Sequence, residues 1–511
     1  MADFSSNTRR IAKNTLMLYI RMFFMMLLGL FTSRIVLEAL GENDFGIYNV
    51  VGGVVAMFTV ISGALTTAVT RFITFEMGKG PSAQLGKVYS TAVNVQIILA
   101  FLVIILAEPV GLWFIDNKMT IDPVRIPAAR MVMHFSLLSF VINLMSVPQM
   151  ASITAHEQMS AYAYIGILDG SLRFLVALLI SRSSSDRLVL YAAMMSAVVL
   201  IVRISYGLYC RMHFPECRYR FIFDKALIKE MFSFAGWNFI GVSSGVLRDQ
   251  GGNILVNIFS GPSVNAARGL AVQLNGAIQS FVTNFMTAVN PQITKSYASG
   301  EHEYMFSLIR KASRMSFYLL FVLALPVLFN TESVMSLWLK EVPEHSVLFV
   351  QLFLVFTLSE CISQPLITAM FATGNIRNYQ IVVGGLQLLN LPVSYVLLKM
   401  GAMPEVTVIV AVVISQICLA ARLFMLEKMI GLSVRDFVVR VYFNVLVVAA
   451  VALVLPVLAA FAVPGGPVGF VVKASVAVIS AGLSIFLVGC SKQERRDVIG
   501  FIKNRLGGKK S

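Results

Sequence analysis

Fourteen apolar runs, spread from residue 12 to residue 490, constrain this chain more than any other feature. They lie near residues 12–38, 45–70, 88–114, 127–150, 161–181, 188–210, 232–258, 264–291, 314–330, 346–372, 378–400, 404–426, 437–463 and 467–490. A helix of about 20 apolar residues crosses the hydrocarbon core of a bilayer. In lipid the backbone must satisfy its own hydrogen bonds, so such runs form helices. The sequence therefore predicts an all-α integral membrane protein with about 14 transmembrane helices.

Composition excludes a water-soluble protein of this length. Hydrophobic residues make up 57% of the 511 residues and charged residues only 13%, whereas soluble domains contain roughly 25% charged residues. A net charge of +15 also occurs in nucleic-acid-binding proteins, but here the basic clusters fall on one side of the predicted membrane. These clusters are Arg9 to Lys13, Arg211 to Lys229, Lys295 to Arg314 and Lys492 to Lys510. Since basic connections stay in the cytoplasm, we expect cytoplasmic termini and no nucleic-acid partner.

The basic connection at 211–231 divides the first twelve predicted helices into two sets of six. Gly41 and Gly261 each begin a short polar turn after the first helix of a set, which suggests an internal repeat. Secondary transporters often consist of such repeats, with the substrate site at their interface. The predicted organisation is a six-helix lobe at 1–210, a linker at 211–231, a second six-helix lobe at 232–430, two additional helices at 431–490 and a basic tail at 491–511.

Several classes of enzyme are excluded by missing features. The chain has no phosphate-binding GxxxxGK[ST] loop and no HExxH zinc motif. Its five cysteines are scattered without zinc or disulfide spacing. No predicted outer loop is long enough to fold as a catalytic domain. We therefore expect a transporter without catalytic residues, without a metal site and without its own ATP hydrolysis.

Polar side chains gather on the seventh and eighth predicted helices. Arg248 and Asp249 lie near the middle of the seventh helix. Asp249, Asn253 and Asn257 recur every four residues, which places them on one helical face. The eighth helix has a matching stripe, made of Asn265, Arg268, Asn275 and Gln279. Two interpretations are open: the stripes line a water-filled passage, or they form hydrogen bonds that pack the helices together. The two arginines favour the passage, because arginine within a span usually faces water or a partner.

Arginines also occur in the first, fifth and sixth predicted helices. Arg21 and Arg34 lie on nearly opposite faces of the first helix. Arg21 is nearer the centre and is a candidate for the passage, whereas Arg34 can extend its charge to the outer surface. Asp169 and Arg173 are four residues apart and are expected to pair. Arg203 either reaches the membrane interface or lines the passage.

Glu360 lies near the middle of the tenth predicted helix as a lone carboxyl. Such a group is either protonated and hydrogen-bonded, or it binds the cation that drives transport. Asp249 is the other candidate for coupling. The coupling ion would be sodium or a proton, and we expect no further cofactor.

Three stretches of the sequence resemble one family. Residues 236–301 (GWNFIGVSSGVLRDQGGNILVNIFSGPSVNAARGLAVQLNGAIQSFVTNFMTAVNPQITKSYASGE) resemble the polysaccharide flippases of the multidrug/oligosaccharidyl-lipid/polysaccharide exporter superfamily. The segments SRIVLEALGENDFGIYNVVGGVV at 33–55 and ATGNIRNYQI at 372–381 are similar to the same group.

The resemblance implies two six-helix lobes around a central cavity, with two additional C-terminal helices. It implies a bacterial inner-membrane flippase that moves an undecaprenyl-pyrophosphate-linked oligosaccharide to the outer leaflet for O-antigen or capsule synthesis. Other polysaccharide-assembly membrane proteins would be partners, together with membrane lipids. Family members often use arginines in the cavity, and Arg21, Arg248 and Arg268 are the positions here that fit such a role.

The predicted mechanism is alternating access of an anionic, hydrated headgroup to the two sides of the membrane. Arg248 and Arg268 would contact pyrophosphate, and Asn253, Asn257, Asn275 and Gln279 would contact sugar. The alternative within the same superfamily is a cation-coupled multidrug antiporter, which would need more acidic side chains in its interior. A polymerase or ligase acting on lipid-linked sugars would need a larger outer loop.

Overall fold

The computed structural model describes residues 2–56, 58–117, 119, 121–183, 185–339, 342–464 and 466–496. These residues form helices and connecting turns, and no β-strand occurs among them. The predicted all-α fold is therefore confirmed. Of the basic tail predicted at 491–511, residues 497–511 lie outside the described part.

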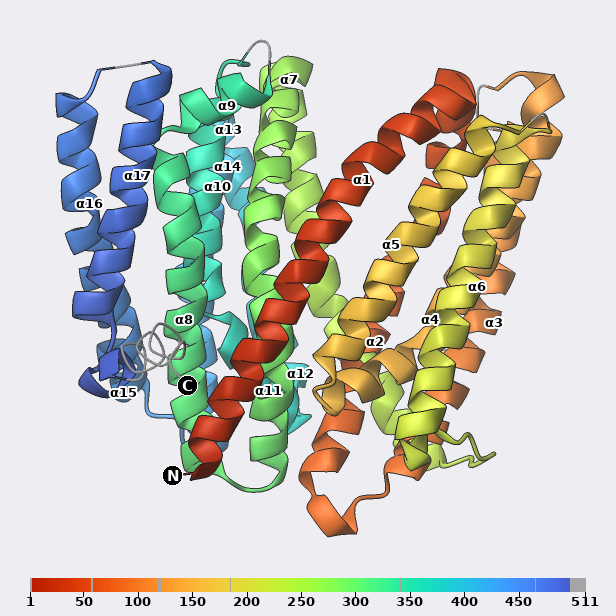
Figure 1. Ribbon diagram of the computed structural model, residues 1–511, viewed down its shortest axis with the longest axis horizontal. Helices are drawn as coiled ribbons and strands as arrows, with labels where there is room; N and C mark the ends of the chain where they lie inside the picture. Colours follow the sequence, from red (N-terminus) through yellow and green to blue (C-terminus); the bar gives the residue numbers. More distant parts are fainter. Residues whose placement is uncertain are drawn as a thin grey trace, which may run out of the picture. The chain divides into compact units, whose positions relative to one another are not determined.

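The α-helices are numbered in chain order in Figure 1. The first six are α1 (Ala2–Ala56), α2 (Thr59–Gly78), α3 (Leu85–Asn117), α4 (Ile126–Ala155), α5 (Met159–Ser181) and α6 (Arg187–His213). The next six are α7 (Lys225–Ala298), α8 (His302–Phe329), α9 (Thr331–Trp338), α10 (Ser346–Cys361), α11 (Gln364–Thr373) and α12 (Arg377–Leu388). The last five are α13 (Asn390–Lys399), α14 (Val406–Ile430), α15 (Val434–Phe437), α16 (Asn444–Ala462) and α17 (Pro467–Ser484).

The helices form two compact units. Unit 1 comprises Met1–Ser243, Thr287–Glu301 and Phe371–Arg377. Unit 2 comprises Ser244–Met286, His302–Met370 and Asn378–Ser511. Helix α7 therefore contributes both of its ends to unit 1 and its middle to unit 2.

Ten helices within the described residues are long and apolar enough to cross a membrane. The bent pair α10 and α11, with 41° between its members, would make an eleventh. The structure thus has fewer such spans than the fourteen predicted. The runs near 346–372 and 378–400 are each divided between two helices, and the run near 45–70 passes from α1 to α2 across residue 57, which is not described. The two halves of α7 are not among the ten, because amide, serine and glycine residues interrupt their apolar sequence.

Two glycines break long helices in the same way. Gly41 in α1 has φ 75° and ψ 167°, and Gly261 in α7 has φ 83° and ψ 175°. This backbone region is accessible essentially only to glycine. The shared geometry agrees with the internal repeat that these two positions suggest in the sequence.

In unit 1, α1 lies along α5 (Figure 1). The two helices approach closely because α5 has glycines at the contact. A Cβ atom at Gly170 would lie 2.4 Å from Met25 Sδ, and one at Gly166 would lie 2.1 Å from Arg21 Nε. Near the Gly41 break an apolar core joins α1, α5 and α6, and it includes Val36, Ala39, Val176, Ala177, Ile180, Tyr191 and Val198.

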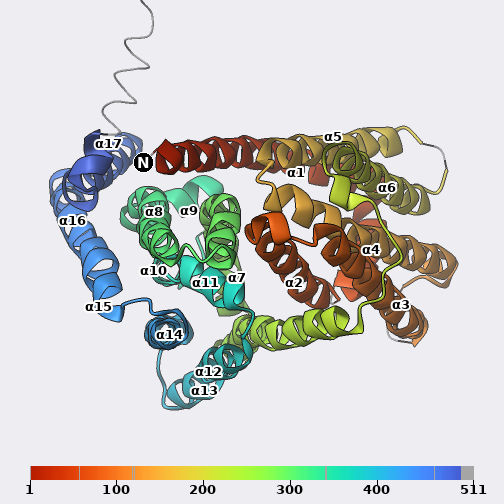
Figure 2. The same ribbon diagram turned by 90° about the horizontal axis from the view of Figure 1, so that it is seen from below.

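In unit 2, the C-terminal helices α16 and α17 lie side by side (Figures 1 and 2) and are attached to α8. The Tyr318 hydroxyl of α8 donates to the Gly489 carbonyl at 3.1 Å. Arg314, one turn earlier in α8, donates to the same carbonyl at 3.1 Å and pairs with Glu494 at 2.7 Å. These polar contacts fix the end of the last helix against α8.

Candidate functional site

The middle of α7 folds back on itself at Gly261, within unit 2, and the two arms are joined by Arg268. The Arg268 guanidinium donates to the Asn253 side-chain oxygen and, at 3.3 Å, to the Asp249 carbonyl. Gly252 provides the necessary space, because a Cβ atom there would lie 2.9 Å from Arg268 Nη2. The predicted polar stripes of the two arms therefore meet.

Arg268 is buried, with an exposed fraction of 4%, and its guanidinium lies 5.4 Å from the centre of the Phe353 ring. Its hydrogen-bond acceptors are neutral, and it forms no ion pair with any residue that the structure describes. Buried charges are normally paired. The hairpin therefore holds a guanidinium whose positive charge is not compensated by a direct carboxylate partner.

Arg248 and Asp249 form an ion pair on the first arm, with 2.9 Å between Nε and Oδ1. The Arg248 side chain is mostly covered and lies 4.9 Å above the Phe356 ring, whereas 58% of the Asp249 side chain is exposed. The hairpin thus contains two guanidinium groups and one carboxylate, and that carboxylate pairs with Arg248 only. The hairpin carries a net positive charge.

The predicted amide residues divide into two groups. Asn253 and Asn275 already form hydrogen bonds within unit 2. Asn253 donates to Gln250 Oε1 at 3.1 Å, and Asn275 accepts from Thr357 Oγ1 at 2.8 Å. Asn257 and Gln279 are exposed, and their side chains have no hydrogen-bond partner among the described residues. Only the second pair is free to contact a ligand without breaking an existing bond.

Arg21 belongs to unit 1 and is not part of the α7 hairpin. Its guanidinium lies 4.6 Å above the Tyr162 ring of α5. Its Nε atom is buried without a hydrogen-bond partner in the described part of the chain. In the same unit Asp169 and Arg173 form the predicted ion pair, at 2.8 Å. Arg34 is exposed.

Glu360 is not a lone carboxyl, which corrects the expectation from the sequence. Its Oε1 atom lies 3.7 Å from Arg422 Nη1, and 15% of its side chain is exposed. Arg422 is almost fully buried and also donates to the Tyr379 hydroxyl at 3.4 Å. The partner comes from α14, 62 residues later, and no local spacing indicates it.

A second polar cluster, in unit 1, was missed by sequence reasoning. The buried Glu157 carboxylate forms ion pairs with Arg10 at 2.7 Å and with Lys295 at 2.8 Å, and it accepts a hydrogen bond from the Gln292 amide at 2.6 Å. Asn14 donates to the Glu157 carbonyl at 3.0 Å. Glu157 lies in the turn between α4 and α5 with φ 59°. We name this group the Glu157 cluster; it joins α1, the α4–α5 turn and the C-terminal end of α7.

Arg71 of α2 makes a comparable connection in unit 1. It donates to the carbonyls of Phe371 and Ala372, at 3.2 and 3.0 Å, and lies 4.5 Å above the Phe75 ring. Gly374, with φ 76°, makes room for it, because a Cβ atom there would lie 2.5 Å from Arg71 Nη2. Residues 287–301 and 371–377, which the sequence assigns to the second lobe, are thus held against the first six helices.

The sequence is similar to known membrane and polysaccharide biosynthesis proteins. Residues 11–297 match the family model described as polysaccharide biosynthesis protein. A curated relative is the uncharacterized membrane protein EpsK of Bacillus subtilis (strain 168), 20% identical over 296 residues, or 57% of this chain. This chain spans about 58% of the length of that relative.

Solved structures share the fold at low identity. A MATE protein in complex with MaD3S covers 83% of this chain and 97% of its own, with a TM-score of 0.72 and 11% identity. The MATE transporter ClbM in complex with Rb+ covers 84% and 96%, with a TM-score of 0.67 and 14% identity. A MOP superfamily transporter from Pyrococcus furiosus covers 82% and 95%, with a TM-score of 0.69 and 11% identity.

These likenesses show a MATE-like transporter fold, and the resemblance read from the sequence is confirmed. The family model matches more than half of the chain. This protein therefore belongs to the polysaccharide biosynthesis protein family, and its helices adopt the fold of the MATE transporters.

Proposed function

We propose that the protein is a flippase that moves an undecaprenyl-pyrophosphate-linked oligosaccharide from the inner to the outer leaflet of the bacterial cytoplasmic membrane. Membership in the polysaccharide biosynthesis family supports a glycan substrate. The observation that carries the proposal is the net positive α7 hairpin, in which Asp249 pairs with Arg248 and the buried Arg268 bonds only neutral acceptors.

The chemistry of the substrate fits this hairpin. Pyrophosphate is anionic, and guanidinium groups bind phosphate oxygens with two parallel hydrogen bonds. Arg248 would contact pyrophosphate directly by exchanging Asp249 for a phosphate oxygen. Arg268 would add its charge and hold the two arms at the right distance. The exposed amides of Asn257 and Gln279 would contact sugar hydroxyls, since polar side chains in a span need water or a polar ligand.

Transport would follow an alternating-access cycle. The Glu157 cluster and the contact of Arg71 with Phe371 and Ala372 are ordered polar connections at helix ends. We propose that they close the cytoplasmic side in one state and separate in the other. Arg21, on α1, would meet the headgroup in the state that is open to the cytoplasm.

Coupling to sodium or protons is assigned to Asp249 and Glu360. Each carboxylate has an arginine partner, at 2.9 and 3.7 Å respectively.

The test uses purified protein in liposomes that contain a fluorescently labelled undecaprenyl-pyrophosphate-linked oligosaccharide. A membrane-impermeant quencher reports label that reaches the outer leaflet, with and without a sodium gradient. We expect protein-dependent translocation of this lipid, and none of the same glycan on an uncharged lipid. Absence of translocation of the charged lipid would contradict the proposal.

The alternative is a cation-coupled multidrug antiporter, because a multidrug resistance MATE family transporter is among the proteins that share the fold, with a TM-score of 0.70. The same liposomes can be loaded with a cationic aromatic dye. Sodium-driven dye movement without movement of the lipid-linked glycan would favour the antiporter.

A further inference from the structure

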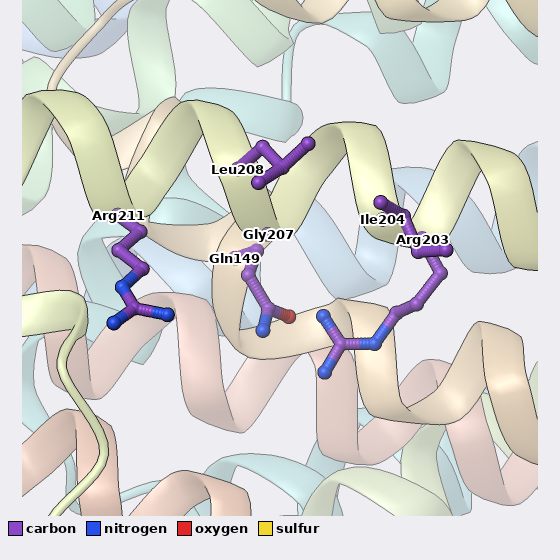
Figure 3. Close-up of a pocket in the computed structure, with 6 residues that line it drawn as sticks. All are labelled: Gln149, Arg203, Ile204, Gly207, Leu208 and Arg211. Atoms are coloured by element: carbon purple, nitrogen blue, oxygen red, sulfur yellow. The ribbon is translucent and has the colours of Figure 1, made fainter.

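Unit 1 has an open groove between α4 and α6 that belongs neither to the α7 hairpin nor to the Glu157 cluster (Figure 3). Its volume is about 410 Å³. The residues that line it are Gln149 of α4 and Arg203, Ile204, Gly207, Leu208 and Arg211 of α6. Two positively charged and two aliphatic side chains thus line the same groove.

The two arginines lie on the same face of α6. Arg203, Gly207 and Arg211 are spaced by four residues, so the two arginine Cα atoms are about 12 Å apart along the helix. Arg203 extends over Gly207 toward Arg211, since a Cβ atom at Gly207 would lie 3.9 Å from Arg203 Nη1. Neither arginine forms an ion pair or hydrogen bond with a described residue. Their charges remain available to a ligand.

Gln149 supplies an independent indication that the groove holds a polar ligand. Its exposed fraction is 5%, and its Oε1 atom is buried without a hydrogen-bond partner among the described residues. Figure 3 shows its side chain between the two arginine side chains. An unsatisfied buried acceptor is costly. A hydroxyl group of a ligand held by the arginines would satisfy it.

The aliphatic side of the groove is open to the surroundings of α6. Ile204 and Leu208 are 51% and 57% exposed. The same stripe continues with Leu200 and Met212, which are 46% and 79% exposed. On a membrane-spanning helix such a stripe faces hydrocarbon. Arg211 lies two residues before the end of α6, where the basic connection at 211–231 begins, so we expect the Arg211 end of the groove at the depth of lipid headgroups and the Arg203 end deeper in the membrane.

We propose that this groove binds an anionic phospholipid, with its phosphate between Arg203 and Arg211 and its acyl chains along Ile204 and Leu208. A headgroup that also carries a hydroxyl, as phosphatidylglycerol does, would donate to Gln149 Oε1. Basic pockets between transmembrane helices on the cytoplasmic side are typical sites for anionic headgroups. The proposal is independent of the transported substrate.

The experiment measures lipid binding to the full-length protein by native mass spectrometry and by thermal stabilisation in detergent. The probes are phosphatidylglycerol, phosphatidylcholine and undecaprenyl phosphate. We expect phosphatidylglycerol to bind at least about tenfold more tightly than phosphatidylcholine. This comparison uses the unmodified protein, so it does not depend on whether a variant folds.

The double variant Arg203→Gln/Arg211→Gln should lose this preference. The matched control is Arg218→Ala/Arg220→Ala, which removes the same charge from the exposed connection beside the groove and should keep the preference. Equal binding of the two phospholipids, or equal loss in both double variants, would overturn the proposal. Protection by undecaprenyl phosphate but not by phosphatidylglycerol would assign the groove to the lipid carrier and would also overturn it.

Discussion

The Glu157 cluster of unit 1 and the α7 hairpin of unit 2 bury charge in opposite ways. Glu157 is 4% exposed and receives two cationic side chains and an amide. Arg268 is also 4% exposed, but its acceptors are a neutral amide oxygen and a backbone carbonyl. In the Glu157 cluster the charges compensate one another, so that breaking the cluster is costly for the fold. A charge without a direct counter-ion can attract a ligand of opposite sign, which is the role that we propose for the hairpin.

The largest effect should come from removing the centre of the Glu157 cluster. Glu157→Ala removes the carboxylate that accepts from Lys295 and Gln292, and hydrogen bonds to a charged group contribute about 1.5–3 kcal/mol each. We expect a strongly lowered midpoint of thermal unfolding in detergent. The matched control is Glu38→Ala in the exposed pair Arg34–Glu38, which should cost about 0–1 kcal/mol. Equal effects of the two variants would contradict the assignment of Glu157 as a stabilising centre.

An intermediate effect is expected from Gly252→Ala in the hairpin. The added Cβ atom would lie 2.9 Å from Arg268 Nη2 and would displace the guanidinium from its acceptors. Hydrogen bonds to charged groups contribute about 1.5–3 kcal/mol, so the unfolding midpoint should fall.

Gly245→Ala on the same arm is the control for that variant. Its Cβ atom would meet only Gln387 Oε1, at 3.9 Å, and glycine to alanine within a helix is favourable by about 0.5–1 kcal/mol. A Gly252→Ala protein as stable as Gly245→Ala would show that Arg268 does not hold the arms together.

The smallest effect on stability should come from Asp249→Asn. More than half of the Asp249 side chain is exposed, so its pair with Arg248 contributes about 0–1 kcal/mol. Because Arg248 then has no competing carboxylate, we expect tighter binding of undecaprenyl pyrophosphate, measured by competition in the liposome assay. Weaker binding with unchanged stability would instead indicate that Asp249 itself contacts the substrate.

Part of the fold and of the α7 hairpin can be predicted from the sequence. Apolar length predicts an all-α membrane protein, but ten helices of the described residues, or eleven with the bent pair α10 and α11, meet the length and hydropathy of a span. The position of Gly41 and Gly261 predicts both helix breaks. Periodicity places Asn253 and Arg268 on polar faces, but it cannot show that Arg268 bonds Asn253 across the turn. That contact occupies the side-chain oxygen of Asn253, whereas Asn257 and Gln279 are exposed.

Partners distant in the chain explain what sequence reasoning missed. Glu157 lies in a short connection, and its partners come from residues 10 and 292–295. Glu360 pairs with Arg422 on another helix. In both cases the pairing depends on how helices pack, and no spacing within one helix reveals it.

The most direct test of the proposed role of the hairpin is the initial rate of translocation of the labelled pyrophosphate-linked oligosaccharide by Arg248→Ala. The reference variant is Arg130→Ala, which removes an exposed arginine paired with Asp116. We predict a loss of at least about tenfold for Arg248→Ala, partial retention for Arg248→Lys, and an unchanged rate for Arg130→Ala. An unchanged rate for a correctly folded Arg248→Ala protein would contradict the account.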